Sequence, residues 1–250
     1  MSSRGDIKRD AAFDSAVERL RRAPEGYALP VPDLAGAQRL PDSARTQRIR
    51  WLAARIPAGS RVLDLGCGRG EILHFLERDL RVEYLGLERE PAFREDCRRI
   101  GVRAIAADFN DLDDPALRTA CSQRWEVVLI IDSINYWRHP AAILAALQDR
   151  SRRIFVTIPN AGHLRRRLQC VAGTAPELPN VRGSPAAGAA EFSTDWFANA
   201  WTMSGFERWC AALGYRAVAV ARRRVDAEYG PLRPLPGLFV RALVYELSPV

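Results

Sequence analysis

The most informative stretch of this chain is Arg61-Val62-Leu63-Asp64-Leu65-Gly66-Cys67-Gly68-Arg69-Gly70. It begins as a short apolar strand, includes an acidic residue, and then breaks into a glycine-rich turn. We expect a helix over 71–77 after the turn, with Ile72, Phe75 and Leu76 on one face. A strand, a tight glycine turn and a helix N-terminus together form a cradle for an anionic or nucleoside-bearing ligand.

The spacing of the glycines narrows the class of ligand. Gly66, Gly68 and Gly70 form G-x-G-x-G, whereas dinucleotide-binding folds carry G-x-G-x-x-G. Glycine at these positions allows positive φ angles and lets a ligand approach the backbone closely. Asp64 precedes the turn, and a carboxylate there suits the methionine amino group of S-adenosylmethionine better than a pyrophosphate. The sequence therefore favours this cofactor over a nicotinamide dinucleotide.

Length and composition limit the broad class of protein. The 250 residues fit one α/β domain with additions, and 48% of them are hydrophobic. No apolar run reaches about 18 residues and the first residues are polar, so we expect no membrane segment, no secretory signal and a cytoplasmic location. The five cysteines and three histidines are scattered, which predicts free thiols and no metal site.

The positive charge of the chain comes almost entirely from arginine. The formal net charge is +7, and Lys8 is the only lysine. A basic surface can bind nucleic acid. However, no stretch interleaves aromatic and basic residues as single-strand binders do. We interpret the arginines as solvated side chains paired with nearby acids, and we do not expect a nucleic-acid partner.

Strands and helices alternate along most of the chain, which predicts a doubly wound, mostly parallel α/β sheet with a C-terminal antiparallel hairpin. The seven strands are expected at 62–65, 82–87, 102–106, 127–131, 154–158, 215–221 and 238–245. Besides 71–77, helices are expected at 43–56, at 91–100, from Pro140 onward, at 161–171, and from a cap at Thr202 or Ser204 through Leu213.

Acidic residues lie at the ends of three successive predicted strands. Asp64 ends the first, Glu88 follows the second, and Asp108 follows the third with Phe109 beside it. In such sheets, ligands bind outside the carboxyl ends of the strands, and an acid about 20 residues past the turn can bind ribose hydroxyls. A carboxylate at Asp108 can accept from an adenine amino group while Phe109 flanks the base. Alternatively, Glu88 or Asp108 is an ordinary acid that caps the next turn.

The segment 62–70, from the first predicted strand through the glycine turn, resembles the first motif of class I S-adenosylmethionine-dependent methyltransferases. The resemblance covers about residues 45–160, and it implies a Rossmann-like methyltransferase sheet that binds S-adenosylmethionine. The methionine moiety, the ribose and the adenine would be held by the implied cofactor-binding residues, which are Asp64, Gly66, Cys67, Gly68, Gly70, Glu88, Asp108 and Phe109.

A narrower resemblance follows the fifth predicted strand, in Ile158-Pro159-Asn160-Ala161-Gly162-His163-Leu164-Arg165-Arg166-Arg167-Leu168. This segment is similar to the methionine biosynthesis protein MetW family, as are the arrangement of Trp196, Thr202 and Phe206 and the segment 132–140. The resemblance implies a link to methionine biosynthesis through association with a homoserine acyltransferase.

The same resemblances divide the chain into parts. Residues 1–43 are expected to form a basic, partly flexible arm outside the family pattern. Residues 44–250 form the methyltransferase-like domain. Within it, about 172–200 is rich in Gly, Pro and Ala and is expected to be an insertion or lid.

The predicted fourth strand ends at the segment where a methyl acceptor would bind. It is followed by Asp132-Ser133-Ile134-Asn135-Tyr136-Trp137 and lacks the Asn/Asp-Pro-Pro-Tyr/Phe motif of enzymes that methylate amino groups. Methyl transfer from a sulfonium needs mainly alignment, and a base only when the acceptor must lose a proton early. We expect Asp132, Tyr136 and His163 near the methyl group. In the alternative, Asp132 holds a turn, Tyr136 is a lid or core aromatic, and His163 caps a helix.

Three functions follow from these features. The first is a methyltransferase acting on a small molecule. The second is a non-catalytic, cofactor-binding accessory subunit of a homoserine acyltransferase, with the basic 165–167 helix and the insertion as a partner surface. The third, suggested only by charge, is a nucleic-acid methyltransferase, whose binding would depend on salt.

Overall fold

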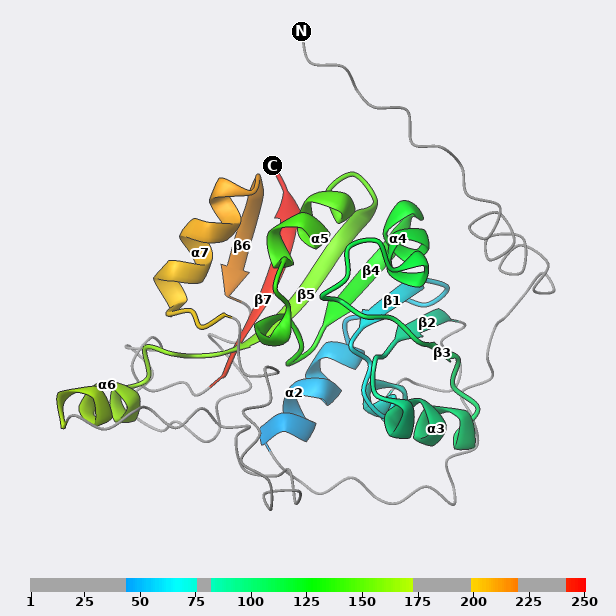
Figure 1. The fold of residues 1–250 in the computed structure, drawn as a ribbon, viewed down its shortest axis with the longest axis horizontal. Helices are drawn as coiled ribbons and strands as arrows, with labels where there is room; N and C mark the ends of the chain where they lie inside the picture. Colours follow the sequence, from blue (N-terminus) through cyan, green and yellow to red (C-terminus); the bar gives the residue numbers. More distant parts are fainter. Residues whose placement is uncertain (1–43, 76–81, 173–198, 220–241) are drawn as a thin grey trace, which may run out of the picture.

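A seven-stranded sheet forms the centre of the protein (Figure 1). The structure is a computed structural model, and it describes residues 44–75, 82–172, 199–219 and 242–250. The strands are β1 (Arg61–Leu65), β2 (Glu83–Leu87), β3 (Ala104–Ile105), β4 (Trp125–Ile130), β5 (Ser151–Pro159), β6 (Tyr215–Ala219) and β7 (Ala242–Pro249).

The order of the strands is β3-β2-β1-β4-β5-β7-β6. Strands β1 to β5 pair in parallel, whereas β7 runs antiparallel to both β5 and β6. The predicted doubly wound, mostly parallel sheet with a C-terminal antiparallel hairpin is therefore confirmed. The carboxyl ends of β1, β2 and β4 lie next to one another, because β1 is paired with the other two.

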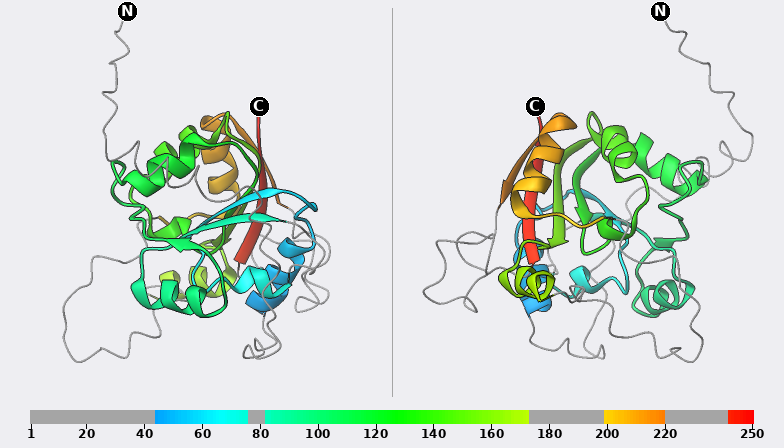
Figure 2. Two further views of the ribbon diagram at one scale, coloured as in Figure 1. Left: turned by 90° about the vertical axis from the view of Figure 1, so that its right-hand side faces the viewer. Right: turned by 60° about the vertical axis from the view of Figure 1, so that its left-hand side comes forward.

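Helices cover both faces of the sheet (Figure 2). They are α2 (Ala44–Ala53), α3 (Pro91–Arg99), α4 (Pro115–Ser122), α5 (Pro140–Leu147), α6 (Leu164–Val171) and α7 (Met203–Ala212), with 3₁₀ helices η2 (Glu71–Phe75) and η3 (Ile134–Tyr136). Successive strand residues point to opposite faces. Val62 accordingly belongs to a buried cluster that includes residues of α2 and α3, whereas Leu63 belongs to the cluster that includes residues of α4, α5 and α7.

The residues that begin the helices explain most of their boundaries. Proline occupies the first turn of α3, α4 and α5, where its missing N–H costs no hydrogen bond. Thr202, one of the two residues predicted to cap α7, does so by accepting a hydrogen bond from the Gly205 amide. Helix α4 was not predicted. Asp114 caps it by accepting from the Ala116 and Leu117 amides.

Several predicted elements differ from the structure; β7, for example, continues to Pro249, beyond the predicted end at 245. The helix expected at 71–77 is wrong in type, because η2 is a 3₁₀ helix that continues the i→i+3 bonds of the turn, Gly70 N–H to Cys67 and Leu73 N–H to Gly70. Strand β3 is shorter than expected, since the Val102 amide still bonds to Cys97 at the end of α3. Helix α6 begins at Leu164 and not at 161.

Several predictions fall outside the described residues. These are the arm at 1–43, residues 76–77 of the predicted helix, almost all of the insertion at about 172–200 with Trp196, and residues 220–221 and 238–241 of the last two predicted strands. In the part of the chain that is described, no helix has the length and apolar character that a bilayer crossing requires.

Candidate cofactor and acceptor site

The glycine turn after β1 has the conformation that its sequence predicts. Gly66, Gly68 and Gly70 have φ angles of 84°, 57° and 71°, in the left-handed region that favours glycine. A Cβ on Gly66 would lie 2.6 Å from the Cβ of Ser133, in the loop after β4. A Cβ on Gly68 would meet nothing within 4 Å. Glycine at position 66 is thus required by close packing, whereas the space beside Gly68 is open.

Glu88 connects the turn to the end of β2. Its Oε2 accepts the Gly68 amide at 2.9 Å and its Oε1 accepts the Glu90 amide at 2.8 Å. A carboxylate has about four acceptor positions, so both oxygens can still accept from another donor. The alternative that Glu88 caps a turn is therefore confirmed, and Glu88 as a residue is 9% exposed beside the open backbone of Gly68.

Asp64 lies deeper, at the end of β1. It is 2% exposed, and its Oδ2 accepts the Tyr84 hydroxyl at 2.8 Å. Burial, then the neighbouring Asp64 charge, raises the pKa of Tyr84, so the phenol keeps its proton and acts as the donor. Tyr84 therefore fixes the orientation of the carboxylate that is predicted to bind the methionine amino group.

Cys67 packs between the turn and the neighbouring strand. A Cβ on Gly86 would lie 2.6 Å from the Cys67 Sγ, so glycine in β2 makes room for this side chain. A hydrogen bond between the Cys67 and Cys97 thiols, followed by burial, raises the pKa of Cys67. Cys67 is thus a buried, neutral thiol that supports the turn.

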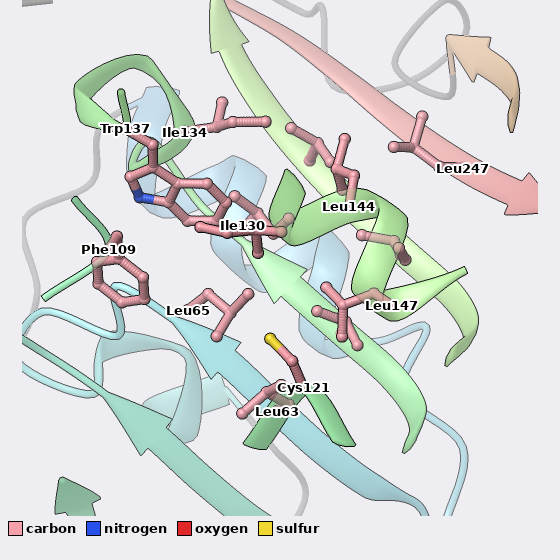
Figure 3. Close-up of a cluster of buried hydrophobic side chains, with 14 of the residues drawn as sticks. Leu63, Leu65, Phe109, Cys121, Ile130, Ile134, Trp137, Leu144, Leu147 and Leu247 are labelled. Carbon is pink, nitrogen blue, oxygen red and sulfur yellow. The ribbon is translucent and has the colours of Figure 1, made fainter. Parts of the chain in front are cut away.

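Asp108 and Phe109 lie in the loop after β3. Asp108 Oδ1 accepts the Asn110 amide at 2.9 Å, so this carboxylate also holds a turn. The Phe109 ring stacks on Trp137, with ring centroids 5.1 Å apart (Figure 3). Asn110 Oδ1 accepts the Arg138 amide at 2.7 Å, which joins the loops after β3 and β4. Phe109 is therefore a buried ring that packs against Trp137, and its contact with adenine stays a prediction.

Asp132 lies two residues after β4 and has a φ of 53°, a left-handed conformation that aspartate tolerates better than most residues. Its amide donates to Thr157 Oγ1 on β5, and that hydroxyl donates to Asp132 Oδ1, both at 2.7 Å. On the other side, Arg48 of α2 forms an ion pair with Oδ2 at 3.4 Å. The candidate base is therefore held from two directions.

Replacing Thr157 with valine will lower the free energy of unfolding by about 2 kcal/mol, because the partly buried Asp132 amide and carboxylate lose a shared partner. Urea denaturation measures the change. Thr157→Ser keeps the hydroxyl and is expected to cost less than about 1 kcal/mol. A loss in Thr157→Val no larger than that in Thr157→Ser would contradict a dominant role of the hydroxyl.

The other two candidate catalytic residues lie in the loops after β4 and β5. Tyr136 ends η3 and packs, half-buried, against the core. His163 precedes α6, and its Nδ1 accepts the Arg165 amide at 3.2 Å, which matches the helix-capping alternative. Their roles near a methyl group stay predictions.

The segment 199–201 ties these two loops together. The Asn199 amide donates to the Asn135 carbonyl at 3.1 Å, and the Asn199 side chain donates to the Trp137 carbonyl at 2.6 Å. Two residues later, the Trp201 carbonyl accepts the Ala161 amide at 2.9 Å, and Trp201 forms a β-bridge with Asn160. The loops after β4 and β5 are therefore connected by one short peptide.

Sequence reasoning missed Arg48, Tyr84 and Thr157, which orient the predicted acids. Tyr84 and Thr157 are ordinary β-strand residues and Arg48 is one arginine among many, so no local motif marks them. Strand pairing could have indicated Tyr84. Asp64 pairs with Gly86 on β2, and Tyr84, two residues before Gly86, points to the same face of the sheet.

A separate cavity of about 370 Å³ lies between β2, β3 and α4, lined mainly by apolar side chains such as Leu85, Leu87 and Ile105. None of the predicted site residues lines it. It is therefore distinct from the site at the carboxyl ends of the strands.

Comparisons with solved structures agree with the fold. A SAM-dependent methyltransferase from Archaeoglobus fulgidus matches with a TM-score of 0.55 and 14% identity, covering 82% of this chain and 94% of the other. The plantazolicin methyltransferase BamL, solved with a triazolic desmethylPZN analog and SAH, matches at 0.53 and 14% identity, covering 82% and 84%. The N-terminal domain of EvdMO1 with SAH bound gives 0.51 and 18%, covering 84% and 83%.

Curated proteins give a shorter match. The cyclopropane-fatty-acyl-phospholipid synthase of Escherichia coli (strain K12) is 28% identical over 79 residues, which is 29% of this chain. The match spans only 21% of the synthase. This chain is therefore similar to one segment of that enzyme.

A protein-family model gives the most extensive sequence match. The model described as methionine biosynthesis protein MetW matches residues 47–213. This range is more than half of the chain, and it includes the glycine turn, the loops after β4 and β5, and α7. The chain therefore belongs to the MetW family.

Proposed function

We propose that this protein binds S-adenosylmethionine at the carboxyl ends of β1 to β4 and transfers its methyl group to a small molecule. The main support is the pairing of Gly68 and Glu88. The Gly68 amide lies 2.9 Å from the Glu88 carboxylate, and the space beside Gly68 is open. A carboxylate in this position can accept hydrogen bonds from ribose hydroxyls. The methyltransferase fold and the SAH-bound neighbours are consistent with this cofactor.

In the proposed complex, the turn residues and Asp64 hold the methionine part, Glu88 the ribose, and Asp108 with Phe109 the adenine. Asp132, Tyr136 and His163 line the acceptor side. When bound, the cofactor supplies an electrophilic methyl group. The chain has to align the acceptor and, where the acceptor carries a proton, remove it. Arg48 and Thr157 would keep Asp132 in one orientation.

A second function is favoured by the ion pair between Asp132 and Arg48. A base already engaged by an arginine at 3.4 Å is less available for proton removal. The family description links the chain to methionine biosynthesis. We therefore keep, as the alternative, a cofactor-binding accessory subunit of a homoserine acyltransferase.

The test is calorimetric titration of the full chain with S-adenosylmethionine and S-adenosylhomocysteine. We expect binding with a dissociation constant on the order of 1 μM, about −8 kcal/mol. Absence of binding to both compounds would contradict the proposal. Binding without methyl transfer to any acceptor, together with co-purification of a homoserine acyltransferase, would select the accessory function.

A further inference from the structure

Arg166 has unusual surroundings for an arginine of this chain. Among the arginines whose side chains the structure describes, it is the one that is buried, with 7% exposure. Its neighbours Arg165 and Arg167 on α6 are both exposed. Helix α6 itself lies beyond the carboxyl end of β5 (Figure 1).

The guanidinium of Arg166 contacts a neutral group. Its Nη1 donates to the Asn160 carbonyl at 3.0 Å, and no carboxylate of the described residues forms an ion pair with it. The less buried Arg48 and Arg153, in contrast, pair with Asp132 and Glu246. A guanidinium has five N–H donors. Among the described residues, only the Asn160 carbonyl accepts a hydrogen bond from this group.

Burying a guanidinium without a carboxylate partner costs folding free energy unless an anion binds to it. Burial lowers the pKa of Arg166, but a guanidinium does not lose its proton in proteins, so the charge persists. Buried charges in proteins are normally paired. Arginine is also the residue best shaped to bind a carboxylate or phosphate through two parallel hydrogen bonds.

The position of Arg166 connects it with the acceptor side of the site. The Asn160 that it contacts directly follows β5, three residues after Thr157, which holds Asp132. Asn160 also forms the bridge to Trp201, in the segment that reaches the loop after β4. Arg166 is thus joined through backbone contacts to both acceptor loops.

We propose that Arg166 binds an oxyanion, a carboxylate or a phosphate, carried by the methyl acceptor. The inference rests on the proposed function, since it names the chemical class of that function's acceptor. A planar guanidinium fixed on the Asn160 carbonyl would orient the acceptor by its anionic end, and it would exclude uncharged molecules of the same size. The buried charge would be left incompletely paired by such neutral molecules.

The test compares Arg166→Gln with the matched control Arg167→Gln. Arg167 is the next residue of α6 and donates to the Gly162 carbonyl of the same turn at 2.8 Å, but it is exposed. The thermal midpoint of the full chain is measured in sodium acetate and in inorganic phosphate, each against sodium chloride of equal ionic strength. At about ten times the dissociation constant of the anion, the midpoint of wild type should rise by about 3 °C.

The expected result is that wild type and Arg167→Gln respond, and that Arg166→Gln does not. A response to acetate but not phosphate identifies a carboxylate as the anion, and the reverse a phosphate. Arg166→Lys keeps the charge without the planar fork and should respond more weakly, which provides a second folded variant. An equal response in Arg166→Gln, or no response beyond chloride in wild type, would overturn the inference.

Titration with S-adenosylhomocysteine separates this inference from the proposed function. Arg166→Gln should bind it as wild type does, to within about threefold, because Arg166 contacts none of the cofactor residues. If wild type does not bind S-adenosylhomocysteine, both the proposed function and the role of Arg166 toward an acceptor are overturned. The thermal response to anions would still decide whether Arg166 is an anion site. Once an acceptor is found, Arg166→Gln should raise its KM by about 30-fold or more.

Discussion

Replacing Glu88 with glutamine is expected to weaken S-adenosylhomocysteine binding by about 100-fold or more, which corresponds to about 3 kcal/mol. In the protein, one oxygen of this carboxylate accepts the Gly68 amide and the other accepts the Glu90 amide. A glutamine offers one acceptor and one NH2 group, so one of the two amides would face a donor. The open turn would lose its support, and the ribose would lose a charged acceptor.

The matched control for this experiment is Glu83→Gln. Glu83 lies at the other end of β2, with a half-exposed side chain that pairs with Arg61. An exposed pair of this kind contributes little to stability. Calorimetry should therefore give the wild-type affinity for Glu83→Gln. If Glu88→Gln also binds within about threefold of wild type while remaining folded, Glu88 does not hold the cofactor.

Replacing Gly66 with alanine is expected to lower the free energy of unfolding by about 3 kcal/mol, as judged by urea denaturation. Part of the loss is backbone strain, because Gly66 has a φ of 84°. The rest is a collision, since the new Cβ would lie 2.6 Å from the Cβ of Ser133. The Ser133 hydroxyl donates to the Leu65 carbonyl at 2.6 Å, so this side chain cannot move away without losing a hydrogen bond.

Two further variants separate strain from collision. Ser133→Gly removes the colliding atom, so Gly66→Ala combined with Ser133→Gly should be less destabilised than the sum of the single variants. Additive losses would contradict the collision. Gly68→Ala meets no atom within 4 Å, so its stability should fall by only about 1 kcal/mol, while its cofactor affinity should fall sharply.

Much of the fold could be predicted because its decisive features are local. The strand, acid and glycines of 61–70 lie within ten consecutive residues, and the buried parallel strands appear as continuous apolar runs. Helix α4 was not predicted, although Asp114 and Pro115 mark its start. The type of η2 depended on hydrogen bonds that continue from the turn.

The candidate site was less predictable, because its supporting contacts are distant in sequence. The acids Asp64, Glu88 and Asp132 could be named from their positions at strand ends. Arg48 and Asp132 are separated by 84 positions, and Thr157 contacts Asp132 across a strand pair. The cofactor residues and the roles of Asp132, Tyr136 and His163 stay predictions that binding and activity measurements will test.

The peptide at 199–201 has a thermodynamic consequence. It is hydrogen-bonded to the loop that contacts Gly66 through Ser133 and to the turn that receives Arg166. If a molecule that binds this peptide changes the affinity for S-adenosylmethionine through these contacts, the cofactor must in turn change the affinity for that molecule. Linkage requires the change to be reciprocal and equal in size. The affinity for S-adenosylhomocysteine, measured with and without a partner, would thus report how strongly that partner senses the cofactor.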